Sequence, residues 1–365
     1  MLYPLVDVLR AAAALLVLTY HVMALGSFQL LPDSLWGLPF RIGWIGVDLF
    51  LVISGFVITL SAAREQEKNP DAFRWSFMQR RLRRIVPLYV LTCVVFIFMV
   101  RPELFLMAPL HLAGMVLSHA LFLQNLSPYT HGVINGVTWS LALEMQFYVA
   151  LILCIGVLLR LGALRSLLLL VGIAWAWRYG TTFFLKPGEA ISHMQVIYTT
   201  ELPGTLDAFA MGITMALVVF KGQGFAANRM KRGWGNFAMW ITTAAVCFWV
   251  AAAIFLPRGS YWSFPEMIIF WRTLLAMGFG AALGAAITCP LRGGGLLRPV
   301  RYLGQISYGM YLWHLPVLTT LLVQPDLRGA RLYVIVLTGA ILLSSISWHW
   351  LEKPWLKGKN LSTAG

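Results

Sequence analysis

The sequence predicts an all-α integral membrane protein, a bundle of about ten transmembrane helices plus a short re-entrant or interfacial helix. Of its 365 residues, 59% are hydrophobic and only 12% are charged, whereas an average soluble domain has about 25% charged residues. The net charge of +14 lies mainly in short loops between apolar runs. This placement indicates membrane topology and argues against a nucleic-acid partner.

Ten apolar windows approach the roughly 20 residues that a helix needs to cross a bilayer. In chain order they cover residues 5–27, 42–61, 85–100, 137–160, 165–184, 203–220, 236–256, 266–289, 302–323 and 332–351. An eleventh apolar run, 108–124, is short and contains two histidines. We expect it to re-enter the membrane or to lie on its surface.

The basic residues predict the orientation of the chain. With ten spans and a cytoplasmic amino terminus, twenty Lys and Arg residues fall on the cytoplasmic side and six outside, with Arg178 and Arg272 left inside spans. This excess satisfies the positive-inside rule, and counting 108–124 as a span would place the basic loops outside. We therefore expect both termini in the cytoplasm. No linker divides the sequence, so residues 1–365 are expected to form a single transmembrane domain.

The first predicted helix carries two ionisable residues, Arg10 and His21, about 16 Å apart along its axis. Arg10 is expected at one membrane interface and His21 well inside the membrane. An ionisable side chain at that depth is costly without a partner or a wet cavity, so it indicates a functional site. The alternative is a histidine that a neighbouring helix merely satisfies.

Two carboxylates are expected at a depth similar to that of His21. By the helical rise, His21, Glu144 and Asp48 all fall about 10 Å below the outer surface. A catalytic histidine needs one ring nitrogen free as a base and the other held by a hydrogen bond, which a carboxylate can accept. Glu144 is predicted to orient His21, with Asp48 as second choice. The alternative for Asp48 is a favourable position at a helix amino terminus.

An arginine cluster precedes the third predicted span. Topology alone explains a basic block at the cytoplasmic end of a helix. However, Arg80 and Arg83 are three residues apart on one helical face, and guanidinium groups present paired donors that suit phosphate oxygens. Together with Arg10 they are candidates for an anion-docking site, with Arg84 as an alternate.

Other polar residues inside the predicted spans are possible cavity residues. Tyr308, Tyr311 and His314 share one helical face, and a polar stripe in a span is expected to face the bundle interior. Ser54 lies in an ISGF segment that helix packing explains equally well. Ser140 stands just outward of Glu144.

The four cysteines have no metal-site spacing, so neither a metal site nor a disulfide framework is expected.

Five blocks of the sequence, in order, resemble the acyltransferase family 3 membrane proteins. The first is the arginine, ten residues and histidine of the first span; the others are GVDLFLVISGF at 46–56, RRLRRIVPLY at 80–89, TWSLALEMQFY at 138–148 and LGQISYGMYLWHLP at 303–316. The resemblance covers nearly the whole chain. Many members carry an additional extracytoplasmic domain, which we do not expect here, because only about a dozen residues follow the last predicted helix.

The resemblance implies a membrane-bound O-acyltransferase of the cell envelope. Such an enzyme moves an acyl group, usually acetyl, from cytoplasmic acyl-CoA to a hydroxyl of a surface or exported glycan, a lipid-linked glycan or a related acceptor, in what would be a bacterial inner membrane. Under this reading the arginines bind acetyl-CoA, and His21 is the base or the acyl carrier. The rival hypothesis is a proton-coupled transporter that uses the buried His21 and Glu144.

Overall fold

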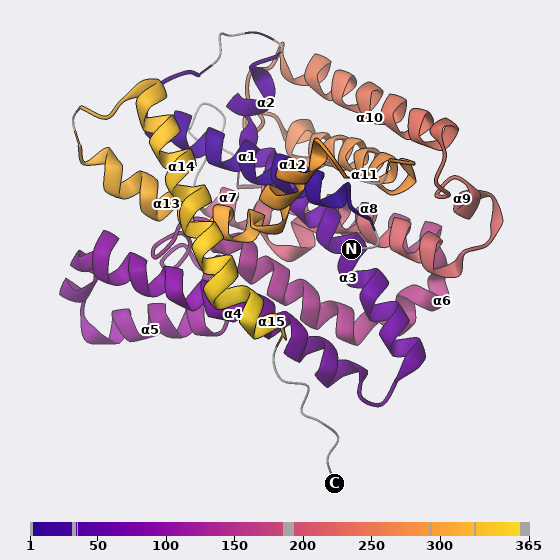
Figure 1. Ribbon diagram of the computed structural model, residues 1–365, viewed down its shortest axis with the longest axis horizontal. Helices are drawn as coiled ribbons and strands as arrows, with labels where there is room; N and C mark the ends of the chain where they lie inside the picture. The colour runs from indigo at the N-terminus through magenta and orange to yellow at the C-terminus, as the bar shows by residue number, and fades with distance from the viewer. Residues whose placement is uncertain are drawn as a thin grey trace.

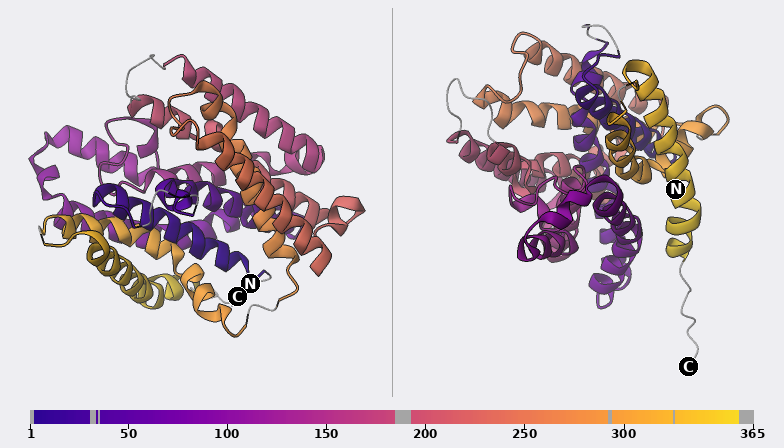
Figure 2. Two further views of the ribbon diagram at one scale, coloured as in Figure 1. Left: turned by 90° about the horizontal axis from the view of Figure 1, so that it is seen from above. Right: turned by 90° about the vertical axis from the view of Figure 1, so that its left-hand side faces the viewer.

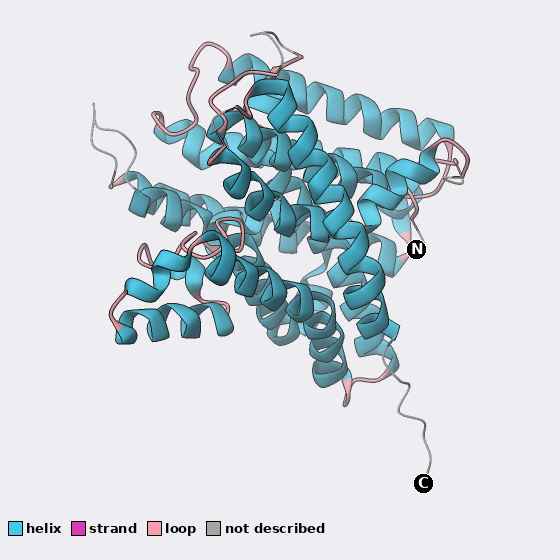
Figure 3. Cartoon of the chain, turned by 60° about the vertical axis from the view of Figure 1, so that its left-hand side comes forward, coloured by secondary structure: helices cyan, strands magenta, loops and turns pink. Residues whose placement is uncertain are grey.

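The computed structural model describes residues 3–30, 34, 36–184, 193–291, 294–324 and 326–357, and throughout these residues it contains helices and loops but no strand (Figure 3). Its main helices are α1 (Val6–Leu25), α2 (Leu38–Arg41), α3 (Gly46–Lys68), α4 (Phe73–Val95), α5 (Pro109–Ala120), α6 (Trp139–Thr182), α7 (His193–Thr200), α8 (Leu202–Lys221), α9 (Gly224–Asn228), α10 (Trp234–Phe255), α11 (Arg272–Thr288), α12 (Leu297–Gln305), α13 (Ser307–Leu322), α14 (Gly329–Ser347) and α15 (Lys353–Lys357). Shorter turns are η1 (Gly43–Ile45), η3 (Pro102–Leu106) and η4 (Gln124–Leu126), and π-helical turns are η2 (Phe96–Val100), η5 (Met267–Trp271) and η6 (Trp348–Glu352).

Eight helices of the described chain are long and apolar enough to cross a membrane, so the protein is a multi-pass membrane protein. This number differs from the expected ten in two places. Two predicted windows, 137–160 and 165–184, fall within the single element α6. A third, 302–323, is divided between α12 and the 16-residue α13.

The long element α6 is not one straight helix. Gly162 has φ 77° and ψ 177°, a conformation that glycine tolerates and other residues rarely adopt. The hydroxyl of Ser166 lies 3.4 Å from the carbonyl oxygen of Leu158, eight residues earlier. Eight residues of continuous helix would extend about 12 Å. The chain therefore turns sharply at Gly162.

The centre of the bundle is built around α3 and α11, which are largely buried by other helices. α3 packs against α1, α6, α8 and α11. Its contact with α8 is close because Gly55 lies against the Phe209 carbonyl and Gly212 against the Val52 carbonyl, where a Cβ atom would find no room. The left view of Figure 2 shows the indigo amino-terminal helices inside the bundle, whereas α10 forms its edge in Figure 1 and is mostly exposed.

Two ion pairs join four helices in the core. Arg272 of α11 donates to Asp48 of α3 at 2.6 Å, and Arg178 of α6 donates to Asp207 of α8 at the same distance. The Thr273 hydroxyl also bonds to both Arg178 and Asp207. Each of the four charged side chains is at most 5% exposed. Because burying a lone charge is costly, these pairs account for the two arginines that the sequence leaves inside spans.

The run 108–124 contains α5, whose 12 residues are too few to cross a bilayer. Its helical length is about 18 Å. α5 packs against η3 and η4 and lies at the lower left of Figure 1. A short helix was expected here.

Candidate active site

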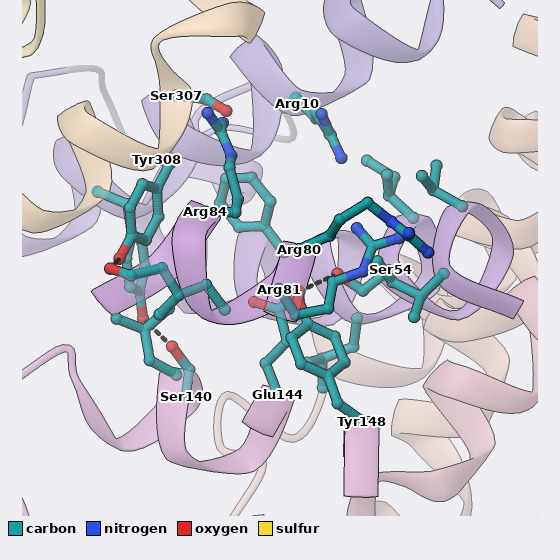
Figure 4. Close-up of a pocket in the computed structure, with 18 of the residues that line it drawn as sticks. Arg10, Ser54, Arg80, Arg81, Arg84, Ser140, Glu144, Tyr148, Ser307 and Tyr308 are labelled. Atoms are coloured by element: carbon teal, nitrogen blue, oxygen red, sulfur yellow. Dashed lines mark hydrogen bonds between the residues drawn. The ribbon is translucent and has the colours of Figure 1, made fainter. Parts of the chain in front are cut away.

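A cavity of about 540 Å³ lies between α1, α3, α4, α6, α13 and η6. Five arginines line it: Arg10, Arg80, Arg81, Arg83 and Arg84. Figure 4 shows Arg10 extending from α1 toward the arginines of α4. Glu144 is the one carboxylate among the described lining residues, so the arginines give the cavity a strong positive charge.

Aromatic rings hold two of these guanidinium groups in place. The Arg81 guanidinium lies 5.1 Å from the Phe77 ring centroid and 5.9 Å from that of Tyr148. That of Arg84 lies 5.1 Å from the Trp348 ring and 5.6 Å from the Tyr308 ring. Stacking of this kind fixes the plane of the guanidinium and leaves its edge free for hydrogen bonds.

Two carboxylates outside the cavity wall pair with two of the arginines. Glu65 binds Arg80 in a solvent-accessible ion pair. Glu352 of η6 is 1% exposed and lies 3.2 Å from Arg84. No ion pair to Arg10, Arg81 or Arg83 is found within the described part of the chain. The cavity therefore retains unpaired positive charge.

Glu144 binds hydroxyl groups. Its Oε1 accepts hydrogen bonds from Ser54 Oγ at 2.8 Å and Tyr148 Oη at 2.6 Å (Figure 4). Ser54 thus faces the cavity, while the neighbouring Gly55 makes the packing contact with α8. The ISGF segment therefore both lines the cavity and packs against a neighbouring helix.

Ser140, Tyr308 and Tyr311 also line the cavity, whereas His314, which was expected there with them, does not. Tyr308 donates to the Ile85 carbonyl at 2.7 Å, which ties α13 to α4. Tyr311 Oη lies 2.6 Å from Ser140 Oγ and 3.0 Å from the Val137 carbonyl oxygen. These bonds fix both tyrosine rings as parts of the cavity wall.

His21 pairs with His314. The two side chains approach with 3.1 Å between His21 Nδ1 and His314 Nε2. Neither histidine lines the cavity itself. The Tyr311 ring, which does, has its centroid 6.0 Å from that of His314. The histidine pair therefore lies behind this part of the cavity wall.

The expectation that a carboxylate orients His21 is corrected by this arrangement. Glu144 binds Ser54 and Tyr148, and Asp48 binds Arg272. Depth along a helix gives the height of a side chain but not the direction in which it points around the helix axis. Equal heights therefore did not bring the three groups together.

Four residues of the site were missed by the sequence reasoning: Arg81, Tyr148, Glu65 and Glu352. Arg81 belongs to the recognised arginine cluster, and Tyr148 follows Glu144 by one helical turn, so spacing alone could have found both. Glu65 and Glu352 reach the cluster through tertiary contacts, which spacing does not reveal. Among the described residues, no group of three or more His, Cys, Asp or Glu side chains is placed to hold a metal ion.

Comparison with known proteins shows the family. A family model described as an acyltransferase domain matches residues 3–350. The chain is 30% identical to YrhL of Bacillus subtilis, over 96% of this chain and 54% of that protein. It is 29% identical to the peptidoglycan O-acetyltransferase OatA of Listeria monocytogenes, over 96% of this chain and 55% of that protein.

The chain covers a larger share of a viral relative than of the two bacterial proteins. The chain is 30% identical to ORF330 of Acidianus two-tailed virus, over 86% of this chain and 82% of that protein. In contrast, the chain spans about half the length of the two bacterial relatives. No solved structure matches it. The match over nearly the whole sequence establishes that the chain belongs to acyltransferase family 3.

Proposed function

We propose that this protein is a membrane O-acetyltransferase that takes an acetyl group from acetyl-CoA and transfers it to a hydroxyl of a cell-envelope glycan. The observation that carries the proposal is the cavity with five arginines, inside a chain of the acyltransferase family. Coenzyme A bears three phosphate groups, and planar guanidinium groups bind phosphate oxygens through paired hydrogen bonds. A volume of about 540 Å³ lies within the range of small-molecule sites.

The arginines divide between two sides of the proposed donor site. Arg10 comes from α1, and Arg80, Arg81, Arg83 and Arg84 come from the first half of α4. A nucleotide between the two helices would meet guanidinium groups from both. Its pantetheine arm would extend along the cavity toward Tyr311, behind which the histidine pair lies.

His21 is the proposed base. It would take the proton of the acceptor hydroxyl as that oxygen attacks the thioester carbonyl carbon. The new C–O bond forms, the C–S bond breaks, and coenzyme A leaves as its thiolate, which recovers a proton. A route through a covalent acyl-enzyme, with His21 or a nearby hydroxyl as the carrier, uses the same donor site.

The proposed acceptor is a hydroxyl of a cell-envelope glycan, with peptidoglycan as the first candidate to test. Support comes from the Listeria relative, which is named as a peptidoglycan O-acetyltransferase. Because this chain spans about half of that protein, the acceptor is assigned at the level of an envelope glycan hydroxyl.

The test is acetyl transfer from isotope-labelled acetyl-CoA by the purified full chain, with peptidoglycan fragments and native lipid-linked glycans as acceptors and mass spectrometry as readout. We expect ester-linked label with the parent and its loss with His21→Ala. The control is His119→Ala, because His119 is also buried but lies on α5. A His21→Ala variant with the parent's rate would refute the proposed base, and absence of label on every acceptor would refute the function.

The proposed orientation places both termini and the arginine mouth of the cavity in the cytoplasm of a bacterial cell, within the inner membrane. It is tested by single cysteines in a cysteine-free background: Glu67→Cys, Asn228→Cys and Asp326→Cys. With an impermeant thiol reagent outside intact cells, we expect only Asp326→Cys to react. Labelling at position 228 would invert the later loops and separate the donor mouth from the cytoplasm.

A further inference from the structure

The geometry points to His314 as the positioning residue that fixes which ring nitrogen of His21 carries the proton. This inference rests on the proposed function, in which His21 is a base. Its starting point is the contact between α1 and α13, where His21 Nδ1 and His314 Nε2 lie 3.1 Å apart and the ring planes meet at 31°. His314 is fully buried.

The direction of this hydrogen bond follows from the other nitrogen of His314. His314 Nδ1 lies 3.1 Å from the carbonyl oxygen of Met310, one helical turn earlier. A carbonyl oxygen only accepts hydrogen bonds, so His314 Nδ1 carries the proton. In a neutral imidazole the second nitrogen is then an acceptor. His314 Nε2 must therefore receive its hydrogen bond from His21 Nδ1.

The consequence for His21 is a defined tautomer. Because its Nδ1 donates to His314, a neutral His21 has an unprotonated Nε2. That lone pair is the one a general base needs, and the other nitrogen is held, as such a base requires. The carbonyl of Met310 thus fixes His314, and His314 fixes His21. A neutral imidazole takes the place of the carboxylate that the sequence suggested.

Two other histidines show that the carbonyl contact alone is an ordinary helical feature. His119 Nδ1 lies 2.8 Å from the Met115 oxygen, and His349 Nδ1 lies 2.9 Å from the Ser345 oxygen, each four residues earlier. The Nε2 atom of His119 is buried without a hydrogen-bond partner in the described structure. His314 differs from both because its Nε2 meets a second imidazole. His119 is therefore a matched control for removal of a buried, tethered histidine.

The direct test is nitrogen NMR of the full chain labelled with ¹⁵N-histidine, with His21→Gln used to assign the resonances. We expect His21 to show the tautomer with its proton on Nδ1. In His314→Leu this acceptor is gone and, among the described residues, only the backbone of Val17 remains as a hydrogen-bond partner for the His21 ring, so we expect a mixture of the two tautomers. A parent protein with the proton of His21 on Nε2 would overturn the inference, whatever the outcome of the transfer assay.

Steady-state kinetics provide the second readout. We expect His314→Leu to lower kcat about 100-fold or more, the low end of what general-base catalysis contributes, with KM for acetyl-CoA nearly unchanged. His314→Gln restores an acceptor oxygen near the position of Nε2 and should recover most of kcat. His119→Leu should leave both constants unchanged. Active parent enzyme together with an equally active His314→Leu variant would refute the positioning role and leave the proposed function intact.

Discussion

The arginines in the core of this protein and the arginines that line its cavity differ in how their charge is balanced. In the core, Arg178 and Arg272 each meet an aspartate at 2.6 Å, and the four side chains are almost completely enclosed. In the cavity, five arginines gather around one lining carboxylate. The core pairs join helices to each other, whereas the cavity arginines face an open volume.

The difference separates a structural charge from one that is available for a ligand. A buried ion pair that is internally matched gains nothing from an external anion, and breaking it leaves an uncompensated charge in the bundle. An excess of guanidinium groups around a cavity attracts an anion that supplies the missing charge. The same residue type therefore has opposite expected phenotypes in the two regions.

The largest expected effect is on stability, in the core. Asp207→Ala leaves Arg178 without its partner and should lower the free energy of unfolding by about 3–5 kcal/mol. SDS titration in mixed micelles measures this. The double variant Arg178→Leu with Asp207→Leu removes both charges and should lose much less. Equal stability of Asp207→Ala and the parent would show that the core pair is not structural.

Glu144 lies in the cavity, but it binds hydroxyl groups rather than an arginine. The effect of neutralising it on stability should therefore fall below that of breaking a core ion pair. Glu144→Gln should cost about 1–2 kcal/mol of unfolding free energy, since an amide oxygen accepts from Ser54 and Tyr148 more weakly than a carboxylate. Combined with Ser54→Ala, the effects should be less than additive. The control is Glu65→Gln, which breaks a solvent-accessible pair and should cost less than about 1 kcal/mol. Full additivity with Ser54→Ala would deny the contact between the two side chains.

The smallest effect is expected at Glu352, which under the proposed function would compete with a donor phosphate for Arg84. Neutralising this carboxylate in Glu352→Gln should free the guanidinium and tighten coenzyme A binding about two- to tenfold, the equivalent of one ordinary hydrogen bond. Titration calorimetry with purified protein measures the change. Weaker binding would instead mean that Glu352 holds Arg84 in its binding position.

The sequence predicts much of this molecule where local pattern determines structure. Apolar runs predicted the helices. Of the residues expected in a cavity, Ser54, Ser140, Tyr308 and Tyr311 line the cavity of the candidate active site, and His314 does not. The arginine cluster, expected at an anion-docking site, lines the same cavity. The break at Gly162 was anticipated as two windows. These features depend on residues close together in the chain.

The features that the sequence did not predict depend on the direction in which a side chain points around its helix axis, and on contacts between segments that are distant in the chain. Asp48 and Glu144 were placed with His21 by depth, but they point toward Arg272 and toward Ser54. The true partner of His21 lies 293 residues away, on α13. Helical spacing could place His314 on a polar face, but only the packing of α13 against α1 decides which residue that face meets.

The central claim, that the cavity arginines bind the donor, is tested most directly by calorimetric titration of coenzyme A into purified Arg10→Lys, Arg80→Lys, Arg83→Lys and Arg84→Lys variants. Lysine keeps the charge but not the paired donors, so binding should weaken by roughly 1.5–3 kcal/mol for a lost bidentate contact, about ten- to a hundredfold. Arg74→Lys, at the exposed start of the same helix and outside the cavity, is the control and should bind as the parent does. If all four cavity variants also bind coenzyme A like the parent, the arginines only orient the chain in the membrane, and the donor site lies elsewhere.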